Sequence, residues 1–152
     1  MDRKEFIKTC GFACLGASTL GLLLQSCAGS KIISAQILGE NIIVPLTNFE
    51  VIKNNEKSFR KYVVVQNDQL KFPICVYRFS DKEYTALYMQ CTHQGAELTA
   101  YGDKIVCSAH GSEFDNKGNV TNAPADKPLK SFPVQIENQN LDSLVEFYGY
   151  GN

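Results

Sequence analysis

Two pairs of cysteine and histidine in the 152-residue chain could bind a metal. Cys91 and His93 form the first pair, and after thirteen intervening residues Cys107 and His110 form the second. The pairs use both histidines of the chain and two of its six cysteines. Two thiolates and two imidazoles are a complete set of protein ligands for one metal centre. A tetrahedral zinc ion would use this set, and so would a [2Fe-2S] cluster with cysteines on one iron and histidines on the other.

The spacing within each pair favours the cluster. Structural zinc pairs usually have two to four residues between their ligands. Cys107 and His110 meet that requirement, but a single residue separates Cys91 from His93. In an extended loop, such a pair directs its side chains in a similar direction but several ångströms apart, which suits two sulfide-bridged irons better than one ion. Zinc remains the alternative.

The stretch around these residues resembles the signature of Rieske iron–sulfur proteins, C-x-H followed after a gap by C-x-x-H-G. The resemblance covers roughly residues 40 to 148. It implies one [2Fe-2S] cluster per chain, with Cys91 and Cys107 on the inner iron and His93 and His110 on the outer iron. It also implies an all-β fold, an antiparallel β sandwich or barrel base with a small inserted cluster-binding β subdomain at about residues 90–128.

Residues beside the ligands indicate how the cluster is tuned. In quinol-oxidising members a disulfide joins the two loops, and its positions are occupied here by Ala96 and Ala109. Ser112 keeps a hydroxyl that in high-potential members donates to a bridging sulfide. Phe114 replaces a tyrosine that donates to a cysteine sulfur. Because each such hydrogen bond stabilises the reduced cluster, we expect an intermediate potential.

A third loop, residues 122–129, contains Pro124 and Pro128. It matches the proline-rich loop that covers the cluster in this family. The two prolines restrict φ and stiffen the loop. We therefore expect it to cover the site.

The N-terminus has the pattern of an export signal. Five charged residues lie within residues 2–8, and residues 9–24 carry no charge. Residues 2–8 resemble a twin-arginine signal, with Lys4 at the second arginine position. Residues 24–27 resemble a lipobox, which predicts a signal peptide over 1–26, a lipidated Cys27 and a linker over 27–31. An uncleaved membrane helix is the alternative, although the apolar run is short for a bilayer span.

The remainder, 32–152, reads as one all-β domain. Residues 32–38, 41–46, 61–66, 72–79, 84–89, 131–137 and 141–148 are predicted strands, residues 54–58 a polar loop, and residues 138–140 a turn. No stretch shows a sustained helical period. Cys75 lies in an apolar run and is expected to be a buried small hydrophobe.

These features predict one-electron transfer in a membrane-tethered protein on the extracytoplasmic face of a bacterial cell envelope. The protein would be an electron-transfer subunit of an oxidoreductase rather than a stand-alone enzyme. The resemblance implies a membrane quinol or a redox subunit as donor and a c-type cytochrome or similar carrier as acceptor. A net charge of −1 provides no positive electrostatic field that would attract nucleic acid. A ferredoxin for an oxygenase is the alternative, and a catalytic oxygenase is excluded because no further histidines could ligate a mononuclear iron.

Overall fold

The computed structural model describes residues 30–39, 41–137 and 144–147. Their fold is all-β, as predicted, apart from one short 3₁₀ helix, η1 (Leu46–Phe49). The strands are β1 (Lys31–Ser34), β2 (Gln36–Leu38), β3 (Asn41–Pro45), β4 (Glu50–Lys53), β5 (Glu56–Phe59), β6 (Tyr62–Gln66), β7 (Ile74–Arg78), β8 (Tyr84–Tyr88), β9 (Thr99–Tyr101), β10 (Lys104–Val106), β11 (Glu113–Asp115), β12 (Val120–Asn122), β13 (Ser131–Phe132), β14 (Val134–Glu137) and β15 (Leu144–Phe147).

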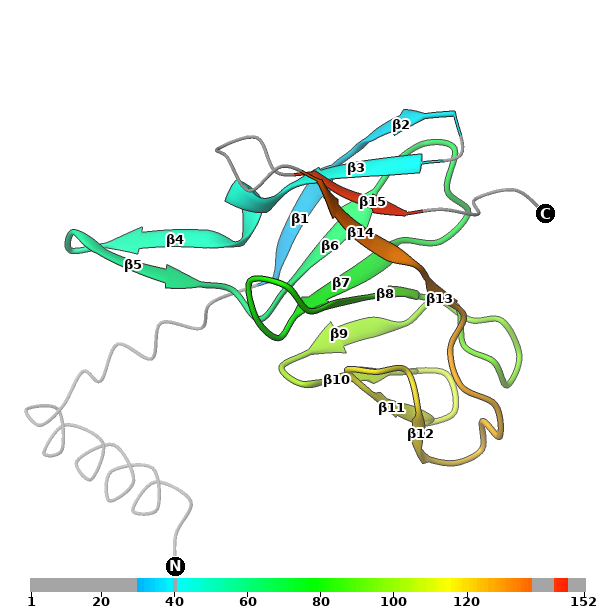
Figure 1. Ribbon diagram of the computed structural model, residues 1–152. Helices are drawn as coiled ribbons and strands as arrows, with labels where there is room; N and C mark the ends of the chain where they lie inside the picture. The colour runs from blue at the N-terminus through cyan, green and yellow to red at the C-terminus, as the bar shows by residue number, and fades with distance from the viewer. Residues whose placement is uncertain (1–29, 40, 138–143, 148–152) are drawn as a thin grey trace, which may run out of the picture.

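The strands form four sheets rather than a closed barrel within this described part of the chain (Figure 1). The central sheet has the order β1-β6-β7-β8-β13. Its pairs are antiparallel except for β1 and β6, which run parallel with Lys31 opposite Val63. The antiparallel prediction is therefore wrong for this one pair, because β1 reaches β6 only after two intervening hairpins.

The central sheet is covered on both faces. Strand side chains alternate between faces, so Val63 and Val65 join one core whereas Val64 joins the other. The first core also contains Ile42 and Val44 from β3, which lies in a second sheet ordered β14-β15-β3-β2. The second core contains the buried thiols and the strands of the inserted sheet. Both faces of the central sheet must therefore be apolar, and the unbroken valine run of β6 meets this requirement.

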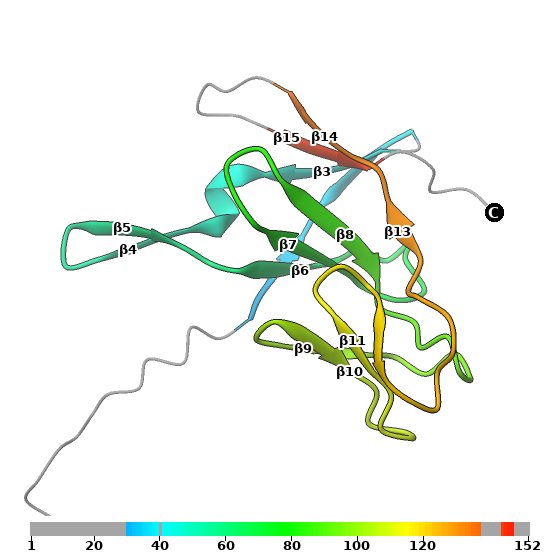
Figure 2. The ribbon, with the colours of Figure 1, turned by 60° about the horizontal axis from the view of Figure 1, so that its bottom comes forward.

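The inserted sheet has the order β12-β11-β10-β9, and Figure 2 shows its strands β9, β10 and β11 below the central sheet. Its four strands lie in the chain between β8 and β13, which pair with each other in the central sheet through Leu87 and Ser131. The Tyr77 hydroxyl donates to the Lys104 carbonyl at 3.2 Å and fastens β10 to the central sheet. The predicted cluster subdomain thus corresponds to a sheet that leaves the base and returns to it.

The largest departure from expectation is the β4–β5 hairpin, where a polar loop was predicted. Lys53 pairs with Glu56 across a two-residue turn. Asn54 and Asn55 occupy that turn with φ of 53° and 63°. Two consecutive left-handed residues are what a type I′ hairpin needs, and asparagine tolerates them better than most residues. The Asn-Asn pair was the signal for this hairpin.

The predicted strand at 131–137 is divided by Pro133 into β13 and β14, which belong to different sheets. Proline has no N–H to donate to a sheet and so suits such a corner. The expected alternation is confirmed, because Phe132 is buried and Val134 and Ile136 are half-buried. The signal peptide at 1–26, Cys27 and the turn at 138–140 lie outside the described residues. No helix among the described residues is long and apolar enough to span a membrane.

Gly118 joins the inserted sheet closely to the base. Its φ is +87°, and a Cβ there would lie 2.9 Å from Cδ2 of Leu87 in β8. Its carbonyl also accepts a hydrogen bond from the Leu129 N–H at 2.9 Å. The turn between β11 and β12 therefore needs glycine both for its backbone and for the contact with β8.

We expect Gly118→Ala to lower the free energy of unfolding by about 1–2 kcal/mol through the left-handed backbone alone, and further through displacement of Leu87. Gly102→Ala is the matched control, because Gly102 has φ +61° but nothing within 4 Å of its added Cβ. Urea unfolding followed by circular dichroism measures both variants. Equal losses would show that the contact with Leu87 has no energetic weight.

Candidate metal centre

Two loops carry the predicted ligands and share one backbone frame. In the loop after β8, the Cys91 N–H donates to the Ala96 carbonyl at 2.8 Å, and the Gly95 N–H returns to the Cys91 carbonyl at 2.8 Å. Gly95 has φ +74°, which closes the turn. The cysteine is thereby fixed at the start of a tight five-residue turn.

The loop after β10 repeats this frame. The Cys107 N–H donates to the Ser112 carbonyl at 2.8 Å, and the Gly111 N–H donates to the Cys107 carbonyl at 2.9 Å. Gly111 has φ +79°. A glycine four residues after each cysteine was the sequence signal for this repeat. Sequence reasoning did not foresee that the two loops would have matching hydrogen-bonded frames.

The thiols are buried and the imidazoles are not. Cys91 is 3% exposed and Cys107 is 1% exposed, whereas His93 is half-buried and His110 is exposed. Burial alone would raise the pKa of the Cys91 thiol. Hydrogen bonds outweigh burial and lower this pKa, and they come from the backbone at His93 and Gln94 and from the side chains of Cys107 and Ser112. The pocket around Cys91 therefore favours a thiolate, the form that binds metals.

The two imidazoles face each other across the loops. The rings of His93 and His110 have centroids 5.0 Å apart and an interplanar angle of 88°. The Nδ1 atom of His93 is buried without a hydrogen-bond partner. A buried polar atom without a partner is costly, and a metal ligand bond would satisfy it. The structure thus brings the two histidine rings together and joins the side chains of Cys91 and Cys107 by a hydrogen bond, while their role as the four ligands of one metal group stays a prediction.

A site for one metal ion would need ligand side chains that lie close to a single point. No group of three or more histidine, cysteine, aspartate or glutamate side chains lies close enough to hold one ion among the residues that the structure describes. The four predicted ligands lie instead on two separate loops, one cysteine and one histidine on each.

Ser112 is the buried polar residue of the site, with 0% exposure. Its Oγ accepts a hydrogen bond from the Ala125 N–H at 3.0 Å. Since that bond uses a lone pair, the hydroxyl proton is left to donate, and a hydrogen bond joins Ser112 to Cys91. Phe114 is fully buried in the core beneath the loops. Ser112, the predicted tuning residue, is therefore directed at the sulfur of Cys91.

The proline-containing loop is tied to both ligand loops. Thr92 Oγ1 donates to the Lys127 carbonyl at 2.7 Å, and Asn122 Nδ2 donates to the Gly111 carbonyl at 2.8 Å. With the Ala125–Ser112 bond, these contacts hold residues 122–129 against the site. Sequence reasoning missed the part that Thr92 and Asn122 play in joining the loops, since a single hydroxyl and a single amide give no pattern.

The other cysteine of the described region behaves as predicted. Cys75 is fully buried in the second core and is unpaired, as are Cys91 and Cys107. Burial raises the pKa of the Cys75 thiol far above its usual value. Such a thiol is protonated and unreactive.

Comparison with known families matches residues 47–133 to the Rieske [2Fe-2S] domain. The match covers more than half of the chain, and the chain belongs to the Rieske [2Fe-2S] domain family. A domain of this family binds one [2Fe-2S] cluster, so the cofactor is this cluster and not the alternative zinc ion.

Two relatives show the range of the family. The chain is 26% identical over 159 residues to the cytochrome b6-f complex iron-sulfur subunit of Trichodesmium erythraeum, covering 93% of this chain and 83% of the relative. It is 38% identical over 72 residues to the biphenyl dioxygenase ferredoxin subunit of a Pseudomonas species, covering 44% of this chain and 64% of the relative.

Solved structures include similar chains. The plasma membrane Rieske protein of Synechocystis PCC 6803 aligns with a TM-score of 0.47 and 22% identity, over 57% of this chain and 85% of that one. A chain of a hyperthermophilic respiratory complex III aligns with a TM-score of 0.47 and 16% identity, over 93% of this chain and 92% of that one.

Ser112→Ala should lower the free energy of unfolding by about 1–3 kcal/mol, because the buried Ala125 N–H loses its acceptor. Ser108→Ala is the control in the same loop, since Ser108 is exposed and exposed substitutions usually stay within about 0.5 kcal/mol. Urea unfolding of the two variants beside the unaltered protein measures the difference. If Ser112→Ala unfolds like the control, the Ala125 contact does not hold the third loop.

Proposed function

We propose that this chain is a one-electron carrier whose [2Fe-2S] cluster is held by Cys91, His93, Cys107 and His110. The observation that carries the proposal is the buried, unpartnered Nδ1 of His93, in a site where two buried cysteines come from matching loops. When bound, a cluster with this ligand set accepts and releases one electron, at a potential of roughly −150 to +300 mV.

The residues around the ligands have different roles in the site. The loop frames fix the positions of the two cysteines through backbone hydrogen bonds. Ser112 and the third loop cover the buried side of the site, which keeps water from the thiolates. The exposed His110 leaves one face open to a partner.

A quinol-oxidising or other respiratory oxidoreductase chain is the favoured setting. A relative that aligns with 93% of this chain is an iron-sulfur subunit of a cytochrome b6-f complex. By that similarity, the donor is a membrane quinol or a redox subunit, and the acceptor is a c-type cytochrome or similar carrier.

A ferredoxin that serves an oxygenase is the second candidate. It is favoured by the 38% identity to a dioxygenase ferredoxin subunit and by Ala96 and Ala109, which replace the disulfide positions. The export pattern of residues 1–26 speaks for the first candidate, because it directs the domain out of the cytoplasm.

The same pattern supports a membrane tether. In the proposal, residues 1–26 are removed as a signal peptide and Cys27 is lipidated. The domain is then attached to the extracytoplasmic face of a bacterial membrane. An exported, tethered carrier fits an envelope electron-transport chain.

Replacing each of Cys91, His93, Cys107 and His110 singly by alanine should abolish the visible absorbance and the low-temperature EPR signal of the reduced protein. Cys75→Ala is the matched control, because Cys75 is equally buried in the same core but is not a proposed ligand. Iron and acid-labile sulfide analysis completes the test. A variant of any of the four that keeps a full cluster would remove that residue from the ligand set.

Cys27→Ala tests the tether. In cells expressing the full chain, we expect this variant to leave the membrane fraction and to lose incorporation of labelled fatty acid. Cys14→Ala, which changes a cysteine within the predicted signal peptide, should keep both. Retention of the Cys27 variant in membranes would favour the uncleaved helix instead.

A further inference from the structure

The chain enters the described fold at one end of the central sheet. The Ser30 side chain forms a hydrogen bond with Tyr62. Lys31 Nζ donates to Asn48 Oδ1 at 2.9 Å, and Asn48 belongs to η1, directly before the β4–β5 hairpin. The entry point therefore lies beside the base of that hairpin (Figure 1).

The turn between β9 and β10 is at the same end. The Tyr62 hydroxyl donates to the Ala100 carbonyl at 3.2 Å, and the Lys61 ammonium pairs with Asp103 at 2.7 Å. Tyr101 thus lies close to the entry point, and 74% of it is exposed. The hairpin and this turn flank the place where the N-terminal segment joins the domain.

Exposed apolar side chains gather at this end. The structure describes five exposed large hydrophobic residues, and four of them are in β1, in the hairpin or at the end of β9: Ile32, Ile52, Phe59 and Tyr101. The fifth, Leu38, is at the end of β2 on the opposite side of the molecule (Figure 1). A local gathering of this kind marks an interaction surface rather than scattered exposure.

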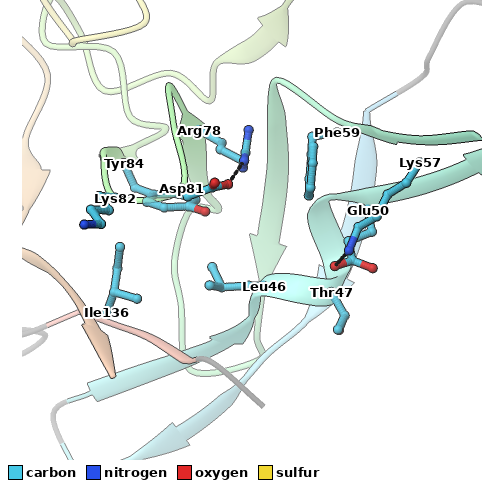
Figure 3. A pocket seen from close by; sticks show the side chains of 10 residues that line it. All are labelled: Leu46, Thr47, Glu50, Lys57, Phe59, Arg78, Asp81, Lys82, Tyr84 and Ile136. Carbon is cyan, nitrogen blue, oxygen red and sulfur yellow. Dashed lines mark hydrogen bonds and ion pairs between the residues drawn. The ribbon is translucent and has the colours of Figure 1, made fainter. Parts of the chain in front are cut away.

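Several charges at this end are paired, and contacts with the β7–β8 loop support the hairpin. Figure 3 shows a cavity of about 500 Å³ between the hairpin and the β7–β8 loop. The Arg78 guanidinium lies 4.0 Å from the Phe59 ring centre and pairs with Asp81, while Lys57 pairs with Glu50 at 2.6 Å. Paired charges reduce the cost of approaching a medium of low polarity.

The length of the N-terminal segment decides what lies against this surface. Lys31 is the fourth residue after Cys27, which is at most about 14 Å of extended chain. With Cys27 lipidated, the entry point is held within that distance of the bilayer. Tyrosine and lysine beside aliphatic side chains suit the interfacial layer of a membrane.

We propose that this end of the domain is a membrane-contact surface, formed by Ile32, Ile52, Tyr101 and the hairpin lysines Lys53 and Lys57, which rests on the lipid bilayer. The proposal depends on the proposed lipid anchor and adds an orientation to it. The ligand loops follow β8 and β10 at the other end of the sheets (Figure 1). The metal centre then faces the aqueous phase, which favours the redox subunit over the membrane quinol as its donor.

Tryptophan fluorescence tests this orientation directly, because the chain has no tryptophan. The full-length, lipidated, cluster-containing protein is prepared with Ile52→Trp, with Tyr101→Trp as a second probe, and with Leu38→Trp as the matched control. Each is bound to vesicles of phosphatidylcholine and phosphatidylglycerol, with and without brominated acyl chains. The two probes should be quenched at least about twice as strongly as the control, since interfacial side chains reach about 5–10 Å into the lipid.

Vesicle flotation is measured on the same samples. If the proteins float and Leu38→Trp is quenched as strongly as both probes, the orientation is overturned while the anchor stands. If the proteins do not float, the anchor itself fails and the membrane-contact surface falls with it. A folding defect in one probe is recognised by loss of the cluster absorbance, and the other probe then decides.

Discussion

The fold depends on a central sheet that is buried on both faces. Strands β6, β7 and β8 cannot alternate apolar with polar residues, because either face of each strand meets a core. One core is closed by the β14-β15-β3-β2 sheet and the other by the inserted β9–β12 sheet. The proposed metal site is built on the second core, so the thiols of Cys91 and Cys107 are continuous with the packing that stabilises the base. Assembly of the site and folding of the domain are therefore linked.

The ligand loops show how little side-chain chemistry is needed to prepare such a site. Each loop is closed by two backbone hydrogen bonds and one left-handed glycine. The side chains add the links between loops, with Ser112 touching both the third loop and Cys91. Because no disulfide joins the two loops among the described residues, these hydrogen bonds and the shared core hold them in register.

Sequence reasoning located the site and most of the strands for identifiable reasons. The Cys-His spacing is local and survives any tertiary context, and the β-branched run at Val63–Val65 is a strong strand signal. The parallel pairing of β1, the Asn54-Asn55 hairpin and the corner at Pro133 were missed. The first depends on long-range packing that no local pattern encodes. The other two had local signals, asparagine at a left-handed turn and proline inside a strand pattern, that were outweighed by polarity and alternation.

The direction of β8 has a consequence for how electrons reach the site. This strand starts at Tyr84, near the proposed lipid contact, and the chain reaches Cys91 seven residues later; at about 3.3 Å per residue that is roughly 23 Å. A carrier that the proposed lipid anchor holds by at most about 14 Å of extended chain cannot shuttle over long distances between partners. In the proposed orientation the acceptor reaches the site from the aqueous layer, so the rate of electron transfer to it depends on collision and on ionic strength.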